Sequence, residues 1–231
     1  MPTKTPTRGE DGENFPPKPP AQLPKSNYLS GMNATIRQYL CRDAVLCPLV
    51  ETLTIPPVSN RSGNLYADLI RSIVGQQLSV KAAQTIYDRF MTLFPDGYAH
   101  PDDILRLDAD TLRSVGLSGQ KAAYIQNVAA FFRSEKLENK DWSDMTDDEI
   151  VDYLTQIKGV GRWTVEMILM FSLDRPDVFP HDDLGIQNTM KALYGLDHSG
   201  KALIQKMKAI AEPWRPYRTY ACRLLWRWKD Q

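Results

Sequence analysis

A pair of carboxylates that follows a glycine-containing turn is the feature of this chain best suited to chemistry. Asp182 and Asp183 come after Phe179-Pro180-His181, at the predicted start of a helix. Two glycines interrupt an earlier run, Gln156-Ile157-Lys158-Gly159-Val160-Gly161-Arg162-Trp163-Thr164, which lies between two helical patterns. Such a hairpin can turn backbone N–H groups toward a phosphate, with a helix N-terminus behind them. A carboxylate held near that hairpin predicts chemistry on a nucleic acid.

Helical periodicity dominates the elements that must position these residues. Apolar side chains recur at helical spacing over about 65–74, 79–90, 122–132, 163–171, 186–193, 203–210 and 216–228. Thr146-Asp147-Asp148-Glu149 is a capping box that opens a further helix, and a turn is expected around Gly116 and Gly119. Convincing β alternation and tandem repeats are missing. The pattern predicts an all-α fold in which the helix over 163–171, apolar nearly all round, is buried.

The composition is compatible with a nucleic-acid enzyme without establishing one. The 231 residues are 42% hydrophobic, enough for the core of one or two domains, and the formal net charge is zero. Residues 95–150 carry 6 Lys/Arg against 12 Asp/Glu, whereas residues 183–231 carry 9 against 4. This asymmetry can create one cationic face for a polyanion. An ordinary solvated surface explains the same charges.

The cysteines and the chain start bound the class of protein. Cys41, Cys47 and Cys222 form neither a paired framework nor a zinc spacing, and their number excludes a four-cysteine iron–sulfur cluster. We therefore expect reduced thiols in an intracellular compartment. No stretch is long and apolar enough to span a membrane, and the start lacks the apolar region of a signal peptide.

Four motifs in order resemble those of the helix–hairpin–helix superfamily of DNA glycosylases. The first is the hairpin run with Pro180-His181-Asp182-Asp183 after it. The segments 73–79, 115–122 and 214–221 are similar to two loops and a helix start of one branch, the 3-methyladenine DNA glycosylase II family. The resemblance covers about residues 28–229.

This resemblance implies a domain organisation. A Pro-rich disordered tail over residues 1–27 precedes a helix–hairpin–helix glycosylase domain over 28–231. Two helical lobes then enclose a central cleft: a middle lobe of about 62–175, and a second lobe of 28–61 plus 176–231. The pattern lacks the N-terminal β domain of larger members, so the compact form is expected.

The resemblance also implies a catalytic residue. Asp183, followed by Leu184-Gly185-Ile186, matches the family's catalytic aspartate, which leaves Asp182 a capping or structural role. Trp163 falls where bifunctional members carry a lysine nucleophile, and Lys158 on the hairpin does not match that position. Without this lysine, Schiff-base cleavage of the strand is not expected. A monofunctional enzyme that leaves an abasic site is implied.

Removal of a base from a duplex requires the base to be flipped into a pocket and the gap to be filled. The loop Gln76-Gln77-Leu78 offers side chains of suitable length, and Gln77 matches the family's plug position, although these glutamines can also simply end a helix. Alkylated purines are cationic, so they leave readily and bind well to aromatic faces. Trp163, Trp226 and Tyr217 match aromatic pocket positions. Helical spacing alone would place Trp226 in a core.

The expected DNA contacts lie on the hairpin, the plug loop and one further loop. They are Lys158, Gly159, Val160, Gly161, Arg162, Thr164, Gln76, Gln77, Leu78, Ser118 and Lys121. By resemblance, the backbone carbonyls of Gln156, Ile157 and Val160 can hold a structural Na+ or K+ that links the hairpin to a phosphate. No cofactor is required, and no iron–sulfur cluster is expected.

The sequence thus predicts a monomeric, monofunctional glycosylase that removes alkylated purines of the 3-methyladenine or 7-methylguanine type from double-stranded DNA, in a bacterial nucleoid or a eukaryotic nucleus. Two alternatives stay open: action of the same scaffold on deaminated or oxidised bases, and a non-catalytic DNA-binding module. The module would need neither Asp183 nor an aromatic pocket. The strongest competing interpretation of Asp183 is a mere helix cap, and His181 is interpreted as a loop residue.

Overall fold

The computed structural model describes residues 32–56 and 63–230, and every regular element within these ranges is a helix. The elements are α1 (Ala34–Leu40), α2 (Cys47–Thr52), α3 (Leu65–Gly75), α4 (Val80–Met91), α5 (Pro101–Arg106), α6 (Ala109–Ser114), α7 (Gly119–Ser134), α8 (Asp147–Leu154), α9 (Arg162–Phe171), α10 (Leu184–Tyr194), α11 (Gly200–Ala211), the 3₁₀ turn η2 (Glu212–Trp214) and α12 (Arg218–Lys229). The predicted all-α fold class is confirmed. No helix in the described ranges could cross a membrane. The tail predicted over 1–27 lies outside them.

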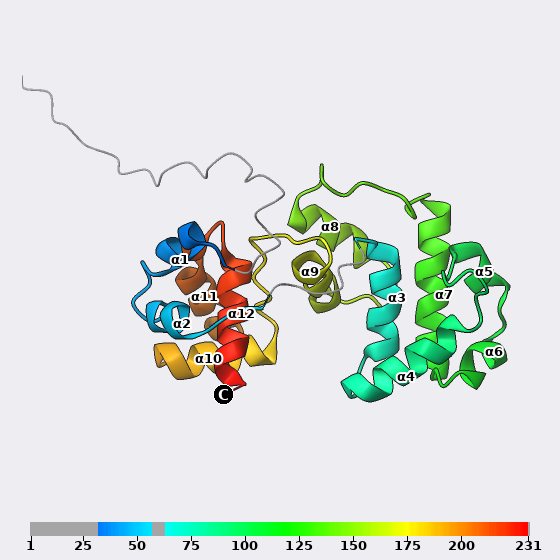
Figure 1. Cartoon of the computed structure of the whole chain (residues 1–231), viewed down its shortest axis with the longest axis horizontal. Coiled ribbons are helices and arrows are strands. Elements are labelled where there is room, and N and C mark those ends of the chain that lie inside the picture. Colours follow the sequence, from blue (N-terminus) through cyan, green and yellow to red (C-terminus); the bar gives the residue numbers. More distant parts are fainter. Residues whose placement is uncertain (1–31, 57–62, 231) are drawn as a thin grey trace, which may run out of the picture.

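The helices form two groups that lie side by side (Figure 1). Helices α3 to α9 form the hairpin lobe, whereas α1, α2 and α10 to α12 form the aspartate lobe. The N-terminal helices join the C-terminal ones because α2 packs on α12. Residues 172–183, which we call the connector, run from α9 to α10 and so pass from one lobe to the other.

Side-chain caps set the start of several helices where the sequence predicted them. Ser79 caps α4, and Thr146 with Glu149 closes the capping box of α8. Gly119, expected in a turn, is instead the first residue of α7, whose cap is Ser118. Helices α1, α2 and α5 were not predicted, because segments of 6 or 7 residues carry too little periodicity.

Helix α9 is mostly buried, as expected, and only the side that carries Trp163, Met167 and Phe171 is partly open. Val165, Leu169 and Met170 are at most 1% exposed, but the Trp163 side chain is 45% exposed. The helix packs against α3 and α8 in the hairpin lobe. Its position at the boundary between the lobes leaves the other side open toward the connector and α10.

Cys41 and Cys47 are joined in a disulfide, with their Cα atoms 4.1 Å apart. The expectation of three reduced thiols is therefore wrong for this pair. The turn between α1 and α2 brings them together, because the Asp43 carboxylate accepts the backbone N–H groups of Val45 and Leu46. Cys222 is free and buried, and burial raises the pKa of its thiol well above the ordinary value.

Candidate active site

The carboxylate of Asp183, at the start of α10, accepts three hydrogen bonds. Oδ1 accepts the backbone N–H of Ile186 and the indole N–H of Trp226, both at 2.9 Å. Oδ2 accepts the indole N–H of Trp163 at 2.8 Å. Asp183 is therefore the N-cap of α10, as the competing interpretation held. A cap requires only one of these bonds. The two indoles, from α9 and α12, hold the carboxylate far more firmly than capping demands.

The two residues before Asp183 contact each other and the start of α10. Asp182, for which a capping or structural role was expected, is not the cap of α10, and its Oδ1 instead lies 3.0 Å from His181 Nδ1. The side-chain amide of Gln187 donates to the His181 carbonyl at 2.9 Å, and burial lowers the pKa of this histidine. Within the part of the chain that the structure describes, His181 and its neighbouring aspartates do not form a metal-binding group.

Gly185 makes room for this arrangement. A Cβ atom there would lie 2.9 Å from Asp183 Oδ1 and 3.1 Å from Trp226 Cδ1, closer than side chains tolerate. Gly185 was not predicted as a site residue. A glycine costs up to about 1 kcal/mol inside a helix, and that cost at the second position of α10 was the signal that could have identified it.

A stripe on α9 faces the same region, and we call it the active face. It consists of Trp163, Met167 and Phe171, which recur every four residues and so share one side of the helix. The ring of Phe171 lies 6.0 Å from that of Trp226. Met167 and Phe171 were not predicted as site residues, although their spacing from Trp163 could have indicated them.

The structure does not bring Tyr217 to this region. Tyr217 is only 2% exposed, and its ring packs edge-on against Tyr39 with centroids 5.1 Å apart. Its phenol therefore contributes to the core of the aspartate lobe and presents no open face to a base. The family resemblance of the segment before α12 made Tyr217 a candidate. Its burial, however, depends on Tyr39, which lies far away in the sequence.

The hairpin between α8 and α9 needs its first glycine. Gly159 has a φ of +105°, and a Cβ atom there would lie 2.2 Å from the ring of Tyr124. Ile157 and Val160 are buried and anchor the turn, whereas Lys158 is exposed. Gly161 is an exposed N-cap without a side-chain bond to the helix. The first N–H groups of α9 thus have an open approach, as anion binding requires.

The plug loop between α3 and α4 projects from the hairpin lobe. Gln77 has a φ of +57° and is exposed, and the side chain of Leu78 is 38% exposed. Val80, at the start of α4, is 89% exposed. A left-handed residue beside exposed apolar side chains is costly. Because strained backbone positions gather at functional sites, this conformation is consistent with a loop that contacts another molecule.

The comparison with known families decides what this hairpin and carboxylate belong to. Residues 70–216 match the HhH-GPD family, described as the HhH-GPD superfamily of base excision DNA repair proteins. The chain belongs to this superfamily. The resemblance seen in the sequence is confirmed, and the hairpin of α8 and α9 is its helix–hairpin–helix motif.

Individual relatives point to one branch of the superfamily. The chain is 38% identical over 165 residues to DNA-3-methyladenine glycosylase 1 of Schizosaccharomyces pombe, covering 70% of this chain and 71% of that protein. It is 35% identical to the putative DNA-3-methyladenine glycosylase YfjP of Bacillus subtilis, over 71% of this chain and 58% of that one. The structure of the S. pombe 3-methyladenine DNA glycosylase in complex with abasic DNA superimposes with a TM-score of 0.72 and 32% identity, covering 86% of this chain and 98% of the other. A DNA-3-methyladenine glycosidase from Bacillus halodurans gives 0.73 and 33%, with 84% and 88% covered.

Three side chains expected to contact DNA in this helix–hairpin–helix protein are engaged elsewhere. Thr164 is 4% exposed, so only its backbone N–H remains for contact. The Lys121 ammonium donates to the Val74 carbonyl at 2.8 Å, and burial lowers its pKa. Lys121 thus supports the base of the plug loop. Ser118 accepts the Lys121 backbone N–H as the cap of α7. Side-chain direction, which sequence spacing does not give, separates Thr164 and Lys121 from the exposed Lys158, whereas Ser118 is itself exposed.

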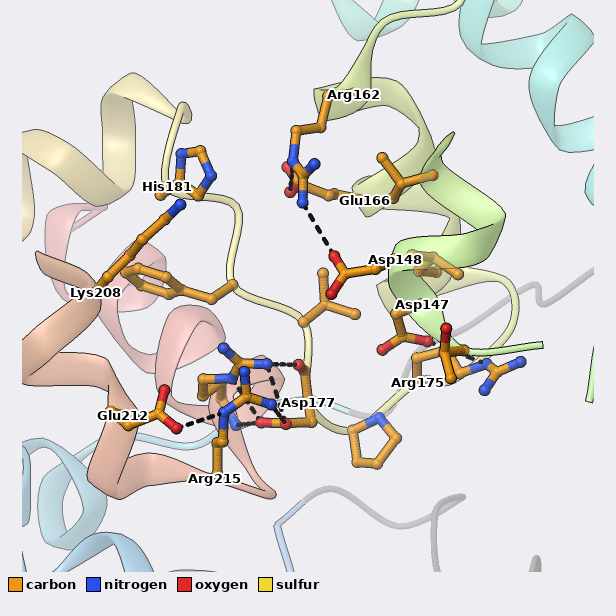
Figure 2. A pocket seen from close by; sticks show the side chains of 17 residues that line it. Asp147, Asp148, Arg162, Glu166, Arg175, Asp177, His181, Lys208, Glu212 and Arg215 are labelled. Atoms are coloured by element: carbon orange, nitrogen blue, oxygen red, sulfur yellow. Dashed lines mark hydrogen bonds and ion pairs between the residues drawn. The ribbon is translucent and has the colours of Figure 1, made fainter. Parts of the chain in front are cut away.

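Arg162 is turned away from the hairpin surface into a polar cleft of about 560 Å³ (Figure 2). The cleft lies against a second stripe of α9, Arg162, Glu166 and Leu169, which we call the cleft face. The Arg162 guanidinium donates to Glu166 Oε1 at 2.9 Å and to Asp148 Oδ1 at 3.4 Å. The DNA contact expected of the Arg162 side chain, which is 40% exposed, stays a prediction, and it would require the guanidinium to leave these two carboxylates.

Charges in the cleft are largely paired with one another. Burial raises the pKa of Glu166 to about 7, an effect that Arg162 only partly offsets, and Glu166 Oε2 is buried without a hydrogen-bond partner among the described residues. Burial likewise raises the pKa of Asp147, against the opposing influence of Arg175. Neither Asp183 nor Trp163 lines this cleft. It is separate from the candidate active site.

Proposed function

We propose that this protein is a monofunctional DNA glycosylase that hydrolyses the N-glycosidic bond of alkylated purines, of the 3-methyladenine and 7-methylguanine type, in base excision repair. The observation that carries the proposal is the Asp183 carboxylate, held by the indoles of Trp163 and Trp226 at the boundary of the two lobes. One chain supplies all three groups, so a monomer suffices.

The geometry supports a mechanism in which Asp183 acts on the sugar. When the bond between C1′ and the purine nitrogen breaks, the electron pair leaves with the cationic base and neutralises it. The sugar gains oxocarbenium character, which the Asp183 carboxylate stabilises. A water molecule then attacks C1′ and loses its proton to Asp183 or to solvent. Because the base already leaves easily, no strong general acid is required.

The donors around Asp183 support the monofunctional assignment. They are two indole N–H groups and one backbone N–H, of Trp163, Trp226 and Ile186. None of these can attack C1′ and form a Schiff base, which requires an amine. Trp163 instead offers a π-face, 45% exposed, to a positively charged base. The product expected is an intact strand with an abasic site.

The hairpin and the plug loop supply the binding surface for double-stranded DNA. The open N-terminus of α9 at Gly161 suits a phosphate, and Gln77 on its projecting loop suits the gap left by a flipped base. Phosphate contacts of this kind carry no sequence information. The enzyme would therefore search DNA without sequence preference and work where DNA is kept, in a nucleoid or a nucleus.

The reaction needs water alone and no cofactor. We further propose that the backbone carbonyls of Gln156, Ile157 and Val160 hold a monovalent cation beside the DNA. The Ile157 carbonyl already accepts the Val160 N–H at 3.0 Å, which leaves it one lone pair for an ion. Such a cation would link the hairpin to a phosphate and take no part in bond cleavage.

Substitution of Asp183 tests this function. Asp183→Asn keeps an oxygen for the cap but removes the negative charge, so excision of 3-methyladenine should fall by about 10²-fold or more. Affinity for abasic DNA should stay within about twofold, because phosphate contacts dominate it. Single-turnover release of base, measured beside binding, checks both. Release at the wild-type rate by the variant would show that Asp183 is not the catalytic group.

A further inference from the structure

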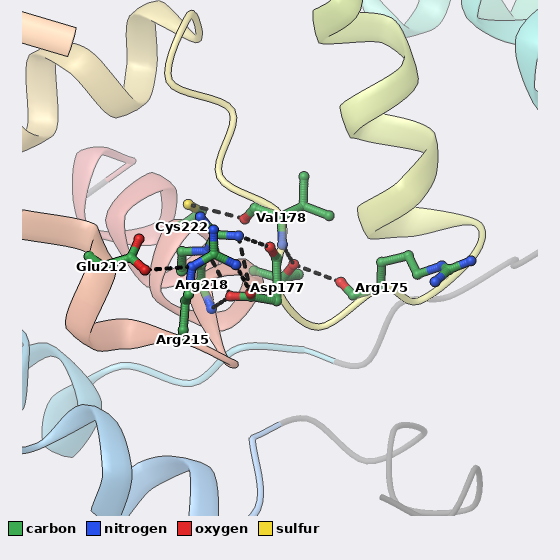
Figure 3. A network of polar contacts seen from close by, with 8 residues as sticks. Arg175, Asp177, Val178, Glu212, Arg215, Arg218 and Cys222 are labelled. Carbon is green, nitrogen blue, oxygen red and sulfur yellow. Dashed lines mark hydrogen bonds and ion pairs between the residues drawn. The ribbon is translucent and has the colours of Figure 1, made fainter. Parts of the chain in front are cut away.

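The connector that carries Asp183 is held at its centre by one carboxylate. Arg218 Nε donates to Asp177 Oδ1 at 2.7 Å, and its Nη2 donates to Asp177 Oδ2 at 3.0 Å and to the Asp177 carbonyl at 2.6 Å (Figure 3). Arg215 adds a bond to Oδ2 at 2.7 Å. The Arg218 side chain is 15% exposed and that of Asp177 19%. A bidentate, poorly hydrated pair of this kind fixes direction as well as distance.

The backbone beside Asp177 is bound to the same helix. The Thr219 hydroxyl donates to the Arg175 carbonyl at 2.7 Å and accepts the Val178 N–H at 3.0 Å. The Thr219 N–H donates to the Pro176 carbonyl at 3.0 Å. Residues 175–178 are therefore bound one after another to the start of α12, in the aspartate lobe.

Arg175 joins this segment to the other lobe. Its Nη2 donates to the carbonyls of Trp142 and Met145 at 2.6 and 3.1 Å, and its Nε lies 3.5 Å from Asp147 Oδ1. These partners precede or begin α8 in the hairpin lobe. Residues 175–178 of the connector are thus attached to both lobes.

The active site depends on how the lobes are placed, because Trp163 belongs to one lobe and Asp183 to the other. We propose that Asp177 and Arg218 are positioning residues for excision: their ion pair sets the connector so that the Asp183 carboxylate meets the Trp163 indole at 2.8 Å. This inference rests on the proposed function. It also gives a role to the segment Trp214–Arg218, whose family resemblance the active site itself does not explain. A misplacement of about 1 Å at a reacting group can cost about 10²-fold in rate.

The test compares Arg218→Met, Arg218→Lys and Asp177→Asn with Leu203→Ala, a core substitution in the same lobe that leaves the connector untouched. Leu203→Ala supplies a matched loss of stability. At a temperature where all variants are folded, Arg218→Met should lower the single-turnover rate of base release about tenfold or more, while affinity for abasic DNA changes less than about twofold. Arg218→Lys should fall between wild type and Arg218→Met, because an ammonium cannot make the bidentate contact. Leu203→Ala should keep the wild-type rate.

A readout independent of excision is the indole N–H resonance of Trp163, assigned with Trp163→Phe. It should shift in Arg218→Met and in Asp177→Asn as its bond to Asp183 weakens, and stay in place in Leu203→Ala. An unmoved resonance in both connector variants overturns the proposal, even if the wild type releases no base. Equal rate losses in Arg218→Met and Leu203→Ala at equal stability also overturn it. Failure of the wild type to excise, with the resonance shifted as expected, counts against the proposed function alone.

Discussion

The two faces of α9 differ in polarity and in how far their side chains are exposed and paired. The active face presents Trp163, which is 45% exposed, and the apolar side chains of Met167 and Phe171. The cleft face carries Arg162 and Glu166, which pair with each other at the edge of a larger cleft. One face is open and apolar beside a firmly held carboxylate, whereas the other is polar and internally compensated.

This difference shows that the number of ionisable groups in a cleft is a poor guide to the site of chemistry here. The polar cleft contains more ionisable groups, but most of these charges neutralise one another and leave no clear preference for a ligand. Beside the active face, donors from α9, α10 and α12 converge on the single carboxylate of Asp183, and Trp163 exposes a π-face next to it. Substitutions on the active face should therefore change catalysis, and those on the cleft face should change stability.

Removal of both indole donors to Asp183, Trp163 on the active face and Trp226 on α12, should have the largest effect on excision. The double substitution Trp163→Phe with Trp226→Phe keeps two aromatic rings but leaves Asp183 only the Ile186 N–H. Base release should fall about 100-fold, since each hydrogen bond to a charged group contributes roughly 1.5–3 kcal/mol. Trp228→Phe, on the same helix as Trp226, is the matched control and should be neutral. An unchanged single-turnover rate in the double variant would mean that the indoles do not hold the carboxylate for catalysis.

A single methyl group at Gly185 should have the next largest effect. Gly185→Ala places a Cβ atom 2.9 Å from Asp183 Oδ1 and 3.1 Å from Trp226, so one of the two must move. We expect about a tenfold loss of excision with an intact fold. Gly119→Ala is the control, because no atom lies within 4 Å of the added methyl group there. Equal rates for both variants would disprove the requirement for a glycine beside Asp183.

A negative charge at Gly161, in the hairpin before α9, should weaken DNA binding without lowering the stability of the protein. Gly161→Asp has free space around it, and aspartate is a better N-cap than glycine by a few tenths of a kcal/mol. The helix should be unharmed, while the new charge repels phosphate and weakens binding to every DNA sequence by about fivefold at low salt. Gly161→Ser is the control, because serine also caps a helix but carries no negative charge. Unchanged affinity and salt dependence for abasic DNA would remove the hairpin from the interface.

On the cleft face, Glu166→Gln should change the pH dependence of stability and leave excision nearly unaffected. Burial raises the pKa of Glu166 from 4.5 to about 7 in the folded protein. The native state therefore binds this proton more tightly than the unfolded state, and wild-type stability should fall as pH rises from about 4.5 to about 7. The variant should lack this decline, a difference on the order of 1–3 kcal/mol at pH 8. Urea unfolding at several pH values measures it, and parallel pH profiles for both proteins would contradict it.

Local patterns made much of the fold predictable. The caps at Ser79 and Thr146 and the cap role of Asp183 depend on residues within one helical turn, so the sequence displays them directly. The glycine hairpin is equally local, because its two glycines lie in one turn. The family resemblance then pointed to Asp183, Trp163 and Trp226 as neighbours, and the structure places them in contact.

Features that depend on tertiary partners or on the detailed shape of a turn were not predictable. The pairing of Cys41 with Cys47 requires the turn that Asp43 organises. The inward direction of Arg162 requires a buried Glu166 one helical turn along α9 and an acidic residue on α8. Burial of Tyr217 requires α1, whose short sequence gave no helical signal. Tyr39 and Asp148 are tertiary partners, and spacing along the chain carries no information about them. For the cysteine pair, which is only six residues apart, the missing information was the conformation of the turn.

The most direct test of the central claim is analysis of the products formed from methylated double-stranded DNA by the unmodified protein. Chromatography should detect free 3-methyladenine, the DNA strand should remain intact until alkali is added, and borohydride should trap no covalent complex. These results follow from a carboxylate that, among the described residues, accepts hydrogen bonds from two indoles and a backbone N–H and from no amine. Absence of released base, or a protein–DNA adduct trapped by borohydride, would contradict the account.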